Sequence, residues 1–290
     1  MYERILVPLD GSELAECSLP YARRIAKRFN SEVILMIVCQ PTGYPELPLK
    51  AYLQKKAEEL HIAGIRISQK LAHGDAATKI LDFAGKNDVK LIIMSTHGSS
   101  KASHWPLGSC TSKVLQKIHV PTLLIRPSGE KTAPFEAEIR RILVGLDGSH
   151  FSEAILPYAE GLADDTGTEV ILLRVVEPVK LPFTAGYVEH EKYEREITAK
   201  AEEEAKKYLQ KKREALASKG INASIALLKG HPSSTILQYA KENKVNLIAI
   251  TTHGFSGISK WAYGSVASNI IEGSTKPILL FRPQLPAASR

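Results

Sequence analysis

The chain has 290 residues, of which 44% are hydrophobic and 24% are charged, and it carries a formal net charge of +7. This is the composition of an ordinary globular protein, long enough for one large domain or for two of about 145 residues. No run approaches the roughly 20 apolar residues that cross a bilayer, and the N-terminus lacks the basic-then-apolar layout of a signal peptide. We therefore expect a cytoplasmic protein without membrane contact.

The positive charge is spread along the chain rather than gathered in one block. Lys and Arg residues are interleaved with Glu, which is typical of a solvated, mildly basic surface, so nucleic acid is not an expected partner. The three cysteines, Cys17, Cys39 and Cys110, fall at unrelated spacings. They predict neither a disulfide framework nor a metal site.

An internal repeat organises the sequence. Residues 4–41 align without a gap over residues 141–178, with 20 identities in 38 positions and an offset of 137. Later segments match at an offset of 156, so the second repeat holds 19 extra residues in its middle. Residues 127–138, between the repeats, are polar and contain Pro and Gly, as expected of a linker. We expect two domains, at residues 1–130 and 139–285.

In chain order, the first repeat alternates short apolar runs with helical patterns. The expected strands are almost continuously apolar, as in parallel strands buried on both faces, and they cover residues 4–10, 32–38, 65–71, 90–96 and 122–127. Residues 14–29 and 76–87 show the three-and-four spacing of amphipathic helices. The alternation predicts an α/β fold with two tandem, doubly wound parallel sheets.

Two features of the helices stand out. Pro20 and Pro157 lie inside the first helical pattern of each repeat and predict a kink or a helix start there. In the second repeat the extra residues extend a charged helix over residues 193–220, which a glycine closes.

Ligands bind to such sheets beyond the carboxyl ends of the strands, where three loops of each repeat meet. The first loop follows strand one and reads PLDGS from Pro8 or GLDGS from Gly145. Its Gly permits a tight turn and its Ser suits a helix N-cap. Asp10 and Asp147 therefore either support that cap or contact a ligand.

The second and third loops complete the predicted edge. Val38 and Val175 form either an apolar floor for a flat ring or part of the core. The third loop opens on a glycine, makes a nine-residue excursion and ends at a Gly-Ser pair, Gly264 and Ser265 in the second repeat. Free amides at a helix N-terminus favour an anion, and glycine admits phosphate oxygens to the backbone. Because the loop occurs twice, binding is favoured over simple capping.

These motifs, in this order and twice, resemble the universal stress protein family over essentially the whole chain. The likeness is carried by ILVPLDGS and ILVGLDGS, STHG and TTHG, the G-x9-G-S spacing, and PTLLIRP and PILLFRP. It implies a Rossmann-like, adenine-nucleotide-binding fold with five parallel strands in each domain, the two domains pairing as a pseudo-dimer. ATP, ADP or AMP is the implied cofactor, with Mg²⁺ beside a triphosphate.

The resemblance implies a nucleotide loop, G-x-x-G-x9-G-(S/T), and residues near the adenosine. Positions of this pattern can be matched to residues in both repeats. In the second repeat the candidate binding residues are Gly145, Asp147, Val175, Thr251, His253, Gly254, Gly264, Ser265 and Val266. In the first they are Pro8, Asp10, Val38, Ser95, Gly98, Gly108 and Ser109. Packing against the strand end also explains His253, as it does His97.

Both repeats depart from the family loop at its first glycine, which is Thr251 in one and Ser95 in the other. The first repeat departs further, because Lys101 replaces Gly257, Pro106 stiffens the excursion and the 19 residues are missing. We therefore expect the better site in the second repeat and a degenerate one in the first.

Common catalytic motifs do not accompany these loops: the sequence lacks GxxxxGK[ST], HExxH and GxSxG. We assign no catalytic or metal-binding residue, and expect a nucleotide-binding stress-response or signalling module that an unidentified downstream protein reads. Two alternatives stay open, a pseudo-dimeric scaffold that binds no nucleotide and a slow ATPase. A homodimer is also compatible with the sequence.

Overall fold

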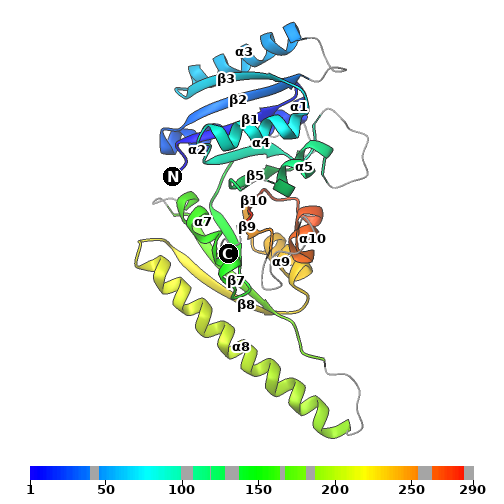
Figure 1. Cartoon of the computed structure of the whole chain (residues 1–290). Helices are drawn as coiled ribbons and strands as arrows, with labels where there is room; N and C mark the ends of the chain where they lie inside the picture. Colours follow the sequence, from blue (N-terminus) through cyan, green and yellow to red (C-terminus); the bar gives the residue numbers. More distant parts are fainter. Residues whose placement is uncertain are drawn as a thin grey trace, which may run out of the picture. The chain divides into compact units, whose positions relative to one another are not determined.

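The computed structural model describes residues 1–39, 46–98, 107–117, 119–127, 137–163, 167–180, 187–253 and 263–283. The chain divides into two compact units (Figure 1). The first holds Met1–Glu138 together with Thr275–Arg290, and the second holds Ile139–Ser274. The division of the sequence into domains at 1–130 and 139–285 stays a prediction.

The first unit is an α/β fold in which strands and helices alternate. Its strands are β1 (Arg4–Leu9), β2 (Glu32–Cys39), β3 (Arg66–His73), β4 (Leu91–Ser95), β5 (Thr122–Ile125) and β10 (Ile278–Phe281). Its helices are α1 (Glu13–Glu16), α2 (Leu19–Phe29), α3 (Glu46–Ile62), α4 (Ala76–Lys86) and α5 (Ser109–Lys117). The strand order is β3-β2-β1-β4-β5-β10. Neighbouring strands are parallel except β10, which is antiparallel to β5.

The second unit repeats this alternation. Its strands are β6 (Arg141–Gly145), β7 (Glu169–Val176), β8 (Ala223–Lys229) and β9 (Leu247–Thr251). Its helices are α6 (His150–Glu153), α7 (Leu156–Leu162), α8 (Tyr187–Ala217), α9 (Pro232–Glu242) and α10 (Ser265–Gly273). The strands lie in the order β9-β6-β7-β8, all parallel. The order reverses at β6, as it does at β1, and a doubly wound sheet offers its ligand crevice at such a point.

The central strands carry the core, and the α/β fold predicted from the apolar runs is confirmed. Every residue of β4 and of β9 is buried. The expectation that residues 65–71 form a buried strand is wrong, because no residue of β3 is buried. β3 lies at the edge of its sheet, so Arg66, Gln69 and Lys70 reach solvent.

The two prolines mark helix starts. The first helical pattern breaks into α1 and α2 in one repeat and into α6 and α7 in the other, with Pro20 and Pro157 in the first turn of the second piece. Proline lacks a backbone N–H, and the first turn of a helix is where that donor has no intrahelical acceptor. The predicted interruption is therefore confirmed.

The extra residues of the second repeat lengthen one helix. α8 has 31 residues, whereas α3 at the matching place has 17 (Figure 1). Gly220 closes α8 with a φ of +79°, and the Ile221 amide donates to the Leu216 carbonyl oxygen at 3.1 Å. An ion pair between Lys212 and Glu153, 2.6 Å long, ties α8 to α6.

Candidate functional site

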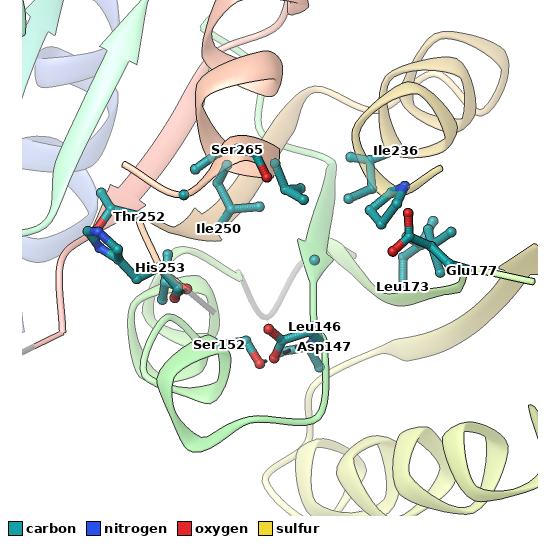
Figure 2. A pocket seen from close by; sticks show the side chains of 17 residues that line it. Leu146, Asp147, Ser152, Leu173, Glu177, Ile236, Ile250, Thr252, His253 and Ser265 are labelled. Atoms are coloured by element: carbon teal, nitrogen blue, oxygen red, sulfur yellow. Dashed lines mark hydrogen bonds between the residues drawn. The ribbon is translucent and has the colours of Figure 1, made fainter. Parts of the chain in front are cut away.

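A cavity of about 320 Å³ lies at the carboxyl ends of β6, β7 and β9 in the second unit (Figure 2). The three predicted loops meet there. Its lining is Gly145, Leu146, Asp147, Ser152, Leu173, Val175, Glu177, Pro232, Ile236, Ile250, Thr251, Thr252, His253, Gly264, Ser265, Val266 and Ala267. Among the described residues, none of the lining comes from α8, so the long helix is not a wall of the cavity.

One part of the cavity is an apolar floor. Leu173 and Val175 of β7, Ile236 of α9 and Ile250 of β9 contribute to it. Gly145 keeps the floor open, because a Cβ at that position would lie 3.0 Å from Ile250 Cγ2. A flat aromatic ring is the kind of group that such a floor receives.

The turn after β6 forms a second part of the cavity. Gly148 has a φ of +89°, and the hydroxyl of Ser149 accepts from the Ser152 amide at 3.1 Å, so Ser149 caps α6 as predicted. Asp147 Oδ1 accepts from the Ser149 amide at 2.9 Å and from its hydroxyl at 2.6 Å. These bonds fix the carboxylate at the cavity edge, where it supports the cap.

The third part is the start of α10. The Gly264 amide donates to the Thr252 carbonyl oxygen at 2.8 Å, which fixes the helix start against the end of β9. The first intrahelical bond runs from the Ser268 amide to the Gly264 carbonyl oxygen at 3.0 Å. The amides of Ser265, Val266 and Ala267 thus have no intrahelical acceptor, and they lie in the cavity wall. This end of the cavity favours an anion.

Polar side chains brace the end of β9. Thr251 donates its hydroxyl to the His253 carbonyl oxygen at 2.7 Å, so the residue that replaces the first motif glycine holds the turn. His253 is 2% exposed, and its Nδ1 lies 2.9 Å from the Thr252 hydroxyl. These contacts are those of a packed histidine that forms part of the cavity wall.

The first unit holds a cavity of the same kind, also about 320 Å³. Its lining is Pro8, Leu9, Asp10, Ala15, Met36, Val38, Ala76, Ile80, Met94, Ser95, Gly98, Gly108, Ser109, Cys110 and Thr111. Volume therefore does not distinguish the two sites. Burial raises the pKa of the Cys110 thiol to about 11, so this part of the wall stays uncharged at neutral pH.

The turns of the first unit repeat those of the second. Ser12 caps α1, and Asp10 Oδ1 accepts from the Ser12 amide at 3.0 Å. Ser95 donates its hydroxyl to the His97 carbonyl oxygen at 2.6 Å. Gly98 packs directly on the carboxylate, since a Cβ there would lie 2.0 Å from Asp10 Oδ2.

The described candidate residues from the sequence all come together at these two cavities. Gly254 lies outside the described residues, as do Lys101, Pro106 and Gly257. Sequence reasoning missed the apolar lining, because Leu173, Ile236 and Ile250 look like any core residue. It also missed Glu177, although an acidic residue directly beyond a buried strand was a usable signal.

Within the described ranges, no cluster of three or more His, Cys, Asp or Glu side chains is arranged to hold a metal ion. In the same part of the chain, no helix is both long and apolar enough to cross a membrane.

Two parallel α/β repeats, each with a cavity between glycine-bearing loops at the strand ends, define a tandem protein of the Rossmann-like class. Residues 1–126 and 138–282 each match the universal stress protein family. The chain belongs to that family and contains two copies of its domain.

Known relatives support both the single domain and the tandem arrangement. Universal stress protein YxiE of Bacillus subtilis is 33% identical over 147 residues, which are 49% of this chain and 98% of that protein. A universal stress protein of Mycolicibacterium smegmatis is 23% identical over 300 residues and covers 97% of both chains. The crystal structure of a universal stress protein from Archaeoglobus fulgidus shares the fold, with a TM-score of 0.70 at 20% identity over 97% of this chain and 99% of that chain.

Proposed function

We propose that the protein binds an adenine nucleotide in the cavity of the second repeat and acts as a stress-response or signalling module. The bound nucleotide, ATP, ADP or AMP, sets a conformation that a downstream protein reads. Family membership and the implied nucleotide loop support this assignment. Mg²⁺ would accompany a bound triphosphate.

One observation carries the proposal: a single cavity joins an anion-binding end to an apolar floor. The amides of Ser265 and Val266, which have no intrahelical acceptor, begin α10 on one side, and Val175 and Ile236 line another. A nucleotide has the same division, with charged phosphates at one end and a flat base at the other. The volume, about 320 Å³, lies in the usual range for small-molecule sites.

The decisive variant is Gly264→Asp, with Gly264→Asn as its neutral match. Gly264 is the N-cap of α10 with φ −66° and ψ 156°, a conformation open to any residue. Asp and Asn are both good N-caps, so the fold should survive either change. We expect the added carboxylate to occupy the first-turn amides and repel phosphate, weakening ATP binding by at least about tenfold.

Isothermal titration with Mg·ATP measures the affinity and the number of sites, and circular dichroism checks the fold. The wild type and Gly264→Asn should bind one ATP per chain, and Gly108→Asp should leave that site intact. Two sites, one of which is lost in Gly108→Asp, would show that the first repeat also binds. Unchanged ATP binding in Gly264→Asp would refute the proposed site.

The turn after β6 favours a second candidate function, an interaction scaffold without nucleotide. Asp147 and Ser149 already satisfy each other in capping α6, so the DGS motif needs no ligand to explain it. Absence of ATP, ADP and AMP binding in the wild type would select this reading. Phosphate release above that of Gly264→Asp would instead indicate a slow ATPase.

A further inference from the structure

Glu177 is an acidic residue of the second-repeat cavity, and its side chain takes no part in the hydrogen bonds of the turn after β6. It follows the carboxyl end of β7 and lines the cavity, where its side chain is exposed. Asp147, the other acidic lining residue, is held by Ser149. Within the described ranges, Glu177 makes no hydrogen bond or ion pair. An ionised carboxylate at the rim of an apolar floor can accept a hydrogen bond from a donor that a ligand supplies.

The position of Glu177 places it at the base end of the cavity. β7 and β9 flank β6 on opposite sides, and α10 follows β9. Figure 2 shows Glu177 grouped with Leu173 and Ile236, across the cavity from Thr252 and His253. A nucleotide with its phosphates at the start of α10 and its ring on this floor directs an edge of its base toward Glu177.

An ionised carboxylate only accepts hydrogen bonds. Adenine presents an exocyclic amino group, which donates, whereas hypoxanthine has a carbonyl oxygen at the same position, which accepts. We infer that Glu177 selects the base of the bound nucleotide by accepting a hydrogen bond from this amino group. The inference rests on the proposed nucleotide site and names the feature of the ligand that the site reads.

The first repeat lacks this feature among its described lining residues. Asp10 is the acidic residue there, and it is bonded to Ser12 in the turn after β1. Gln40, which matches Glu177 at the offset of 137, lies outside the described residues. A glutamine side chain both donates and accepts hydrogen bonds, so it suits an amino group and a carbonyl alike. Glu177→Gln therefore places in the second repeat the residue type that the first repeat has at this position, and it should weaken the selection of the base.

The test compares ATP with inosine triphosphate, whose base carries a carbonyl in place of the amino group and a proton on the neighbouring N1. Isothermal titration with each, in the presence of Mg²⁺, gives an affinity ratio for wild type, Glu177→Gln and Glu204→Gln. Glu204 is an exposed residue of α8 outside the cavity, so its variant removes the same charge and controls for long-range repulsion of the phosphates.

We expect the wild type and Glu204→Gln to prefer ATP by about tenfold, and Glu177→Gln to bring the ratio close to one. An unchanged ratio in Glu177→Gln, with ATP still bound, overturns this inference alone. Failure of the wild type to bind either nucleotide overturns the proposed function as well. The two failures are therefore distinguishable.

Discussion

At the scale of single residues, the two cavities depend on glycines that lie against other side chains. Gly145 leaves room beside Ile250, and Gly98 leaves room for the Asp10 carboxylate. Neither contact requires an unusual backbone conformation, because neither glycine has a positive φ. These positions require a residue without a side chain. Substitution by alanine, which adds one methyl group, is the smallest change that tests this requirement.

We expect Gly98→Ala to destabilise the first unit. Its Cβ would lie 2.0 Å from Asp10 Oδ2, and Asp10 cannot withdraw without stretching its bonds to Ser12. A loss of about 1–2 kcal/mol follows from disrupting those bonds, which lowers the melting temperature by roughly 3 °C or more. Differential scanning calorimetry measures this shift.

Gly85→Ala is the matched control for that substitution. Gly85 lies within α4, and a Cβ there meets nothing within 4 Å. Alanine is the better helix former, so this variant should melt at the wild-type temperature or slightly above it. Equal melting temperatures for the Gly98→Ala and Gly85→Ala variants would contradict the packing argument.

At the scale of elements, the helices after β3 and β8 start differently in the two repeats. Asp75 caps α4 by accepting from the Thr78 amide at 3.0 Å, whereas His231 at the start of α9 makes no side-chain cap. The hydrogen bonds from the backbone and the hydroxyl of Thr78, together with Lys113, lower the pKa of Asp75 to about 2. α4 therefore has a titratable side-chain cap that α9 lacks.

The cap of α4 predicts a pH dependence of stability. The pKa of Asp75 is lower in the folded chain than its ordinary value near 4, so its charge stabilises the fold above about pH 4. That contribution is lost as the pH falls toward about 2. Asp75→Asn keeps a capping side chain without the charge. It should melt below the wild type at pH 7, and the difference should shrink between about pH 4 and 2.

Thermal melts of both chains from pH 7 downward test this expectation. Asp82→Asn is the control, because Asp82 is an exposed residue of the same helix and lies away from its start. Its melting temperature should differ little from that of the wild type at any pH. A constant difference between Asp75→Asn and the wild type across the acid range would rule out the charged cap.

The elements also show what the sequence could and could not predict. The repeat, the helix starts at Pro20 and Pro157 and the DGS caps follow from local residue chemistry, which acts within a few positions. The burial of β3 was predicted wrongly because β3 lies at the edge of its sheet. The edge position depends on the order of the strands and not on the residues of any one strand. The apolar lining was hidden for a similar reason, since Ile236 and Ile250 become a cavity wall only after folding.

At the scale of the whole molecule, the first unit takes a strand from the far end of the sequence. β10 pairs with β5 in antiparallel register, Leu279 facing Leu123 and Ile278 facing Leu124. Leu279 and Leu123 are fully buried. The last strands of the two repeats thus pair with each other.

Removal of β10 should therefore affect the first unit. A chain that stops after residue 274 lacks the partner of β5, which then presents an unpaired strand edge. We expect faster amide hydrogen exchange in residues 122–125 and a tendency to aggregate. A chain that stops after residue 283 keeps β10 and is the control. Identical exchange of β5 in the two truncated chains would contradict the prediction.

The same pairing has a consequence for how the protein is made. Ribosomes complete β1 to β5 early, and domains generally fold in the order of synthesis. The strand that completes this sheet is translated only at residues 278–281. Until almost the whole of the second repeat has been translated, β5 therefore lacks its β10 partner, and a stalled nascent chain exposes the β5 edge.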